Sequence, residues 1–194
     1  MPTTYAHYKF GKEVLSALPR PLQNSIEAHR ELFDIGLHGP DILFYYNALK
    51  KDPVNEQGHT LHEQFADEFF HHAVEVIEKA KDPAAARAYI YGFICHFALD
   101  SECHPYVEKI MQVGRVSHNE IEMELDRMML TEDYHDPLRY LTAKHIQPKM
   151  EYAEVIAPFF KDVTAEQIYK ALKGMVFYHK LFLADSEEHT SELQ

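Results

Sequence analysis

Apolar residues recur along most of this chain at the three- and four-residue spacing of a helix face. The longest such pattern predicts one helix over residues 60–79, with a buried stripe formed by Phe65, Phe69, Phe70, Ala73, Val76 and Ile77. No run alternates apolar and polar residues for long enough to indicate a sheet, and glycines number only seven. The pattern therefore predicts an all-α protein, a single compact domain of roughly seven to nine helices.

Proline, glycine and capping residues suggest where these helices begin and end. In the first third of the chain we expect a helix over 10–18, a second over 22–34, a third that starts at Ile42 with Asp41 as its cap, and a loop over 50–58. Further on we expect a helix from Asp82 to about His104, one capped by Ser117 and Glu120, one opened by Asp136, and one from Thr164 to about Leu183. The helix ending at His104 is expected to stop there because Pro105 disfavours helical geometry in the residue before it.

Composition narrows the range of functions. The chain has 194 residues, of which 46% are hydrophobic, so one domain with a substantial core is expected. Its 31 acidic and 19 basic residues give a formal net charge of −12, which repels nucleic-acid phosphates and anionic head groups. A long nucleic acid is therefore not expected as a partner, although metal cations in a pocket would reverse the field locally.

The N-terminus lacks the basic start and apolar run of a signal peptide, and apolar stretches such as 42–46 are far too short to span a bilayer. We therefore predict a cytoplasmic protein without stable membrane insertion. Cys95 and Cys103 lie eight residues apart on one predicted helix, about 12 Å along its axis. We expect both to be free thiols.

The last nine residues, SEEHTSELQ, read like the in-frame translation of a common sequencing adapter. We therefore expect a domain over residues 1–185, truncated at its C-terminal end, followed by a non-native tail over 186–194.

Histidine is unusually frequent, with 14 in the chain, and several histidines are spaced as metal ligands would be. His96 and Asp100 lie four residues apart and share one helix face, and His104 follows after four more. His118 and Glu122 repeat this spacing on the next predicted helix. Imidazole and carboxylate groups at this spacing can chelate one ion, so the pattern predicts a metal site. The alternative is a buried network of hydrogen-bonded histidines.

The motif His-x-x-x-Asp-x-x-x-His followed by His-x-x-x-Glu resembles the zinc-dependent phospholipase C family. That family includes bacterial phosphatidylcholine-hydrolysing enzymes and the catalytic domain of clostridial alpha-toxin, and single-strand nucleases share its fold. The resemblance covers about residues 1–126. It implies an all-helical domain built around a cluster of zinc ions.

The resemblance also implies roles for individual residues. His104, His118 and Glu122 would hold one zinc ion, while His96 and Asp100 would serve a close pair of ions, with Asp100 as the bridge. The segment TYAHYKFG would supply His7 to the second ion of that pair. The segment GPDILFYY would supply Asp41 as a ligand and base, and GHTLH would supply His62, with His59 as the alternative. Tyr5, Tyr45, Tyr46, Glu102 and Asp126 are candidates for orienting the imidazole rings.

One feature of the family is absent from this sequence. Its secreted phospholipases use the amine of an N-terminal tryptophan as a zinc ligand, and this chain has no tryptophan. Removal of Met1 would expose the amine of Pro2 in its place. The expected cofactor is accordingly two or three zinc ions.

The resemblance implies a zinc-dependent hydrolase of phosphoric diesters, a phospholipase C that uses a metal-bridged hydroxide with Asp41 as the catalytic base. The expected substrate is a small phosphodiester or a phospholipid, and no protein partner can be inferred. Two alternatives remain open: a non-catalytic module whose helices are held together by structural zinc, and a nuclease on the same fold.

Overall fold

Helices make up every regular element in the part of the chain that the computed structural model describes, residues 4–114 and 116–191. The α-helices are α1 (Thr4–Ala17), α2 (Arg20–Glu27), α3 (Arg30–Gly36), α4 (Pro53–Glu63), α5 (Ala66–Lys79), α6 (Pro83–Gly114), α7 (His118–Glu132), α8 (Met150–Ile156) and α9 (Ala165–Ser191). Two short 3₁₀ helices, η1 (Gly39–Tyr45) and η2 (Ala157–Phe159), complete the set. The predicted all-α fold is confirmed.

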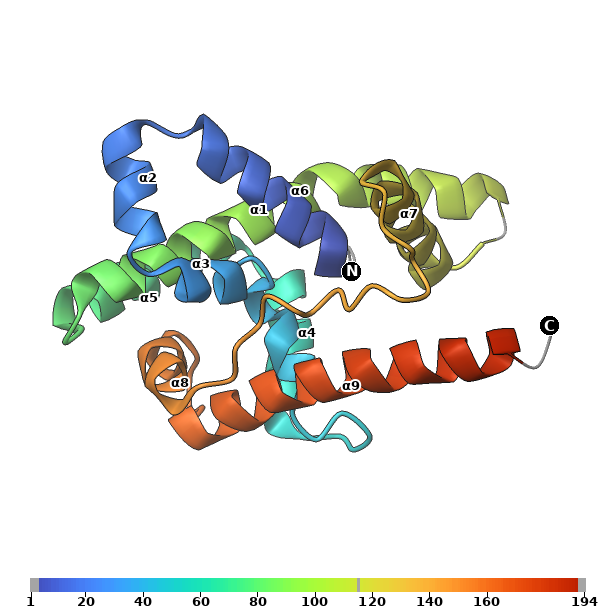
Figure 1. Cartoon of the computed structure of the whole chain (residues 1–194). Coiled ribbons are helices and arrows are strands. Elements are labelled where there is room, and N and C mark those ends of the chain that lie inside the picture. The colour runs from blue at the N-terminus through green and yellow to red at the C-terminus, as the bar shows by residue number, and fades with distance from the viewer. Residues whose placement is uncertain (1–3, 115, 192–194) are drawn as a thin grey trace.

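The long helix α6 is the element around which the others are arranged, as Figure 1 shows. It packs against α1, α3, α5, α7 and α8. The crossing with α3 is the tightest, because glycines face each other there: a Cβ on Gly92 would lie 2.2 Å from the Phe33 carbonyl oxygen. This backbone-to-backbone approach brings the end of α3, and η1 after it, against the middle of α6.

Two apolar clusters form the core. The larger one joins α6, η1, α8 and α9, and its members include Ile42, Tyr89, Ile156, Ile168 and Leu172. The smaller one lies where α1, α2 and α3 meet α6, and it contains Leu15, Ile26, Phe33, Leu37 and Cys95. Cys95 and Cys103 are both free thiols, as predicted.

The predicted end of α6 at His104 is wrong, because the helix continues through Pro105 to Gly114. Proline lacks the N–H that would bond the Ser101 carbonyl, but both residues are exposed, so water can satisfy that oxygen. Packing of α6 against α7 holds the helix together beyond the proline.

The predicted helix over 60–79 is two helices. The chain leaves helical geometry at Gln64 and Phe65, because α4 packs against η1 whereas α5 packs against α6. Phe65 is 90% exposed rather than part of a buried stripe. The predicted loop over 50–58 is also wrong, because Asp52 and Asn55 form a capping box that starts α4 at Pro53.

Other boundaries differ as well. The predicted helix over 22–34 is interrupted at His29, whose φ of −133° and ψ of 40° are not helical. Asp41 caps no helix; it lies inside η1, and His38 occupies the N-cap position. The segment after Asp136 forms turns rather than a helix. The capping boxes of Ser117 with Glu120 and of Thr164 with Gln167 are confirmed.

Candidate metal centre

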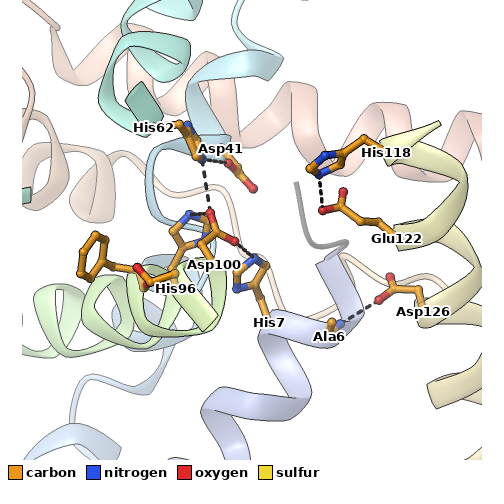
Figure 2. Close-up of polar contacts among 11 residues, drawn as sticks. Ala6, His7, Asp41, His62, His96, Asp100, His118, Glu122 and Asp126 are labelled. Carbon is orange, nitrogen blue, oxygen red and sulfur yellow. Dashed lines mark hydrogen bonds and ion pairs between the residues drawn. The ribbon is translucent and has the colours of Figure 1, made fainter. Parts of the chain in front are cut away.

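Eight residues predicted as ligands come from five separate elements and meet in three groups. His7 lies on α1, Asp41 on η1 and His62 on α4, while α6 and α7 supply the others. The groups are His7 with His96 and Asp100, Asp41 with His62 and His96, and His104 with His118 and Glu122. Within each group, one nitrogen or oxygen atom from each residue lies within 4.8 Å of the others. Figure 2 shows the first two groups side by side, with His118 and Glu122 a short way off.

Asp100 connects the first two groups. Its Oδ1 lies 3.4 Å from His7 Nε2, and its Oδ2 lies 3.3 Å from His96 Nε2 and 3.7 Å from His62 Nε2. The i, i+4 spacing of His96 and Asp100 on α6 places both side chains on one face. The two oxygens of one carboxylate therefore point toward different groups.

The imidazole of His62 has a fixed orientation and tautomer. Its Nδ1 donates a hydrogen bond to the Gly58 carbonyl oxygen at 2.7 Å, and a carbonyl can only accept. In the neutral ring Nε2 then carries the lone pair, and this atom lies 3.0 Å from Asp41 Oδ1. At this distance a positive charge lies between or beside the two atoms, either a bound cation or a second proton on the ring. Burial opposes that proton, but the hydrogen bond and charge of Asp41 outweigh burial and raise the pKa of His62.

Most of these polar atoms are buried and have no hydrogen-bond partner among the described residues. They are both ring nitrogens of His7 and of His96, Nε2 of His62 and of His104, and one oxygen each of Asp41 and Asp100. Leaving such an atom unsatisfied costs about 1–3 kcal/mol. Tetrahedral zinc with bonds of about 2.05 Å places its ligand atoms roughly 3.3 Å apart. The observed separations of 3.0 to 3.7 Å fit that arrangement, so the residues present suit zinc.

Burial and charge shift the protonation of these groups. Burial, together with the stacked imidazole of His96, lowers the pKa of His7. Burial alone would raise the pKa of Asp100, but the imidazoles of His7 and His96 hold it well below its usual value. For the pair of Asp100 and His7 these shifts favour a charged carboxylate beside a neutral imidazole, the forms in which both bind metal.

The third group joins α6 to α7. His118 Nε2 lies 2.6 Å from Glu122 Oε1, and the His104 and His118 rings stand nearly perpendicular with centroids 5.4 Å apart. Glu122 is 2% exposed, an unusual position for a carboxylate unless it is paired or bound to an ion. Pro2, whose amine removal of Met1 would expose, lies outside the described residues.

The structure distinguishes His62 from His59. Both lie on α4, but His59 is exposed and packs against the Phe44 ring, whereas His62 reaches Asp41. Three other histidines, which no spacing singles out as ligands, form partly buried hydrogen bonds. His38 and His145 share a hydrogen bond of 2.7 Å between their Nε2 atoms, and His179 contacts the hydroxyls of Thr4, Tyr45 and Thr142.

Asp126, one turn after Glu122 on α7, holds the beginning of α1. Its carboxylate accepts hydrogen bonds from the backbone N–H groups of Tyr5 at 3.0 Å and of Ala6 at 2.9 Å. Carboxylates stabilise the free amides and the positive end of a helix dipole at this position. Asp126 therefore fixes the helix that carries His7, which is a different contact from the predicted one with an imidazole ring.

A pocket of about 640 Å³ lies beside the candidate metal centre. His62, His96, Asp100 and His104 lie on its polar side. Its other walls carry phenylalanines from α5, α6, η2 and the residues next to them, namely Phe65, Phe69, Phe93, Phe97, Phe159 and Phe160. The sequence did not predict this aromatic wall, because its phenylalanines come from distant segments. The one local indication of it was Phe97, which is half exposed and follows His96 directly. A pocket of this kind suits a ligand with one anionic and one apolar part.

Comparison with known proteins agrees with this geometry. A protein-family model described as zinc dependent phospholipase C matches residues 6–174. No curated protein and no solved structure matches the chain significantly. None of the described helices is long and apolar enough to cross a membrane.

Proposed function

The chain belongs to the zinc-dependent phospholipase C family, and on that premise we propose that it hydrolyses phosphoric diesters, with a phospholipid as substrate. The family supports a zinc-dependent hydrolase. The observation that carries the finer proposal is the position of the candidate ligands at one end of an aromatic pocket.

His7, Asp41, His62, His96 and Asp100 would hold a close pair of zinc ions, and His104, His118 and Glu122 would hold a third. When bound, the ions would supply an activated water molecule and positive charge against the phosphate. Asp100 would keep the pair together, because its two oxygens face different groups. Asp41 would take up the proton of the water at its carboxylate, and the Gly58 carbonyl would keep His62 Nε2 aimed at the site.

The phenylalanines of the pocket would bind the apolar part of the substrate and exclude water from the phosphate. An open side also argues against a purely structural zinc site, which has four protein ligands and no free position. In the described part of the chain each group contributes three residues, and four of the eight side chains line the pocket.

The proposal is tested with the purified chain by measuring zinc per molecule together with hydrolysis of phosphatidylcholine, an aryl phosphodiester and single-stranded DNA. We expect two or three zinc ions, loss of activity with a strong chelator, and recovery when zinc is restored. Hydrolysis of phosphatidylcholine should exceed that of DNA. A protein that keeps its activity after verified removal of all metal would contradict the proposal.

A further inference from the structure

A second groove, of about 470 Å³, lies between α9 and the loop that follows η1. Lys50, Lys170 and Lys173 line it, and none of its described lining residues is acidic. In a chain with a formal net charge of −12, a concave surface with three lysines and no carboxylate is exceptional. No ion pair joins these three lysines to a carboxylate of the described residues, whereas the neighbouring Lys51 pairs with Glu56 at 3.6 Å.

The groove is held open by the backbone. A Cβ on Gly174 would lie 2.4 Å from the Tyr45 carbonyl oxygen, so glycine lets α9 contact the end of η1 directly. The loop then turns at Asn47, whose φ is 49° and whose side-chain amide donates to Asp52 at 3.0 Å. Both walls are therefore positioned before any ligand arrives.

Apolar side chains extend outward beside the lysines. The buried face of α9 contains Ile168, Leu172 and Met175, and the face on the opposite side of the helix contains Lys170, Lys173 and Phe177. Phe177 is 59% exposed, and Leu49, in the adjacent loop, is 86% exposed.

We propose that this lysine–aromatic face, defined as Leu49, Lys50, Lys170, Lys173 and Phe177, docks peripherally on an anionic phospholipid surface. Lysine side chains lay their apolar stems on such a surface and keep their ammonium groups among the head groups. Leu49 and Phe177 would enter the boundary between head groups and acyl chains. Because the rest of the molecule is acidic and repelled, this face also fixes the orientation of the protein on the membrane.

A second copy of the chain is a poorer occupant of this face. A two-fold dimer places the same patch of both subunits together, which would bring three lysines without a carboxylate partner against three others. An anionic lipid surface instead supplies the charge that the lysines lack. The proposal is independent of catalysis, because it concerns a groove other than the one beside the metal centre.

The test is cosedimentation of the purified protein with phosphatidylcholine vesicles that contain 0 to 40% phosphatidylserine, with released water-soluble phosphate measured in the same samples to confirm that the lipid composition is unchanged. We expect binding to rise with the phosphatidylserine content and to weaken at high salt. The triple variant K50E/K170E/K173E should lose at least about tenfold in vesicle partitioning. The variant L49S/F177S should also bind more weakly, because it removes the apolar contact.

A matched control is K12E/K81E/K109E, which changes three exposed lysines elsewhere by the same total charge. It should keep most of the binding, and thermal melting of all variants should show that they are folded. Equal loss of binding in both triple variants would overturn the proposal, because net charge alone would then explain it. Binding that ignores phosphatidylserine, or a concentration-dependent dimer that the L49S/F177S change dissociates, would overturn it as well.

Discussion

Gly39 lies directly against the imidazole of His96, so closely that a Cβ on Gly39 would be 2.3 Å from His96 Cδ2. Its φ of 47° is also one that residues with a side chain rarely adopt. Two constraints therefore require glycine here, two residues before Asp41 and beside a candidate ligand shared by two groups.

Replacing Gly39 by alanine should displace the His96 ring or unfold the turn. We expect the free energy of unfolding to fall by about 1–3 kcal/mol and the zinc content to drop. Urea denaturation and metal analysis measure the two effects. Gly114→Ala is the control, because this glycine is exposed and at the end of α6, and it should change neither quantity appreciably.

His62→Ala should reduce hydrolysis by at least about a hundredfold if His62 is a zinc ligand, since second-shell changes alone cost 10–100-fold. His59→Ala, on the same helix, should leave activity within about twofold. Steady-state rates with an aryl phosphodiester compare the two variants. Equal losses would mean that α4 supports the site only through its fold.

Asp126→Asn should loosen α1. The carboxylate uses both of its oxygens to accept from the N–H groups of Tyr5 and Ala6, whereas an asparagine side chain has only one acceptor oxygen. We expect faster hydrogen exchange in α1 and loss of the metal that depends on His7. Asp133→Asn is the comparison, since Asp133 binds Tyr5 Oη and Lys9 Nζ of the same helix nearer the surface. If only Asp133→Asn affected α1, the positioning role of Asp126 would be wrong.

Phe97→Ser should weaken hydrolysis of long-chain phospholipid by about tenfold, in line with the burial energy of an aromatic side chain. Hydrolysis of a small aryl phosphodiester should hardly change, because such a substrate contacts fewer of the phenylalanines that line the pocket. Val74→Ser, an exposed apolar change on α5 that does not line the pocket, serves as the control. A parallel loss on both substrates would instead indicate damage to the metal centre.

Acid should destabilise the protein partly through His179. Burial lowers the pKa of His179 to about 4, below its unfolded value of 6.5. The unfolded state therefore binds the proton more readily, so stability is full above pH 6.5 and is lost as the pH falls from 6.5 to 4, by up to about 1.4 kcal/mol per unit. Urea titrations of His179→Gln should show a shallower slope in this window, and an unchanged slope would assign the effect to other groups.

The sequence predicted what is encoded within one helix. The spacing of His96, Asp100 and His104, and of His118 with Glu122, follows from helical periodicity, and the structure groups these residues accordingly. The placement of His7, Asp41 and His62 depended on resemblance to a family, because they lie on three different elements and no local pattern connects them. That all eight bind zinc remains a prediction.

The errors arose where tertiary contacts override local preference. Pro105 would be expected to end a helix, but α6 continues beyond it because that part of α6 packs against α7. Phe65 fits an apolar stripe in the sequence, yet the chain turns there so that α4 and α5 can meet different partners. The acidic composition likewise concealed the lysine–aromatic face, which exists only once α9 and the loop after η1 lie together.

Because α6 is continuous, it fixes the separation between two parts of the candidate metal centre. His96 and His104 belong to different groups but lie on one unbroken rod, about 12 Å apart along its axis. Inserting or deleting a single residue between them would rotate one group by about 100° relative to the other. Apart from Asp100, itself a candidate ligand, relatives of this protein can therefore vary in composition over residues 97–103, but the number of residues in that interval should stay constant.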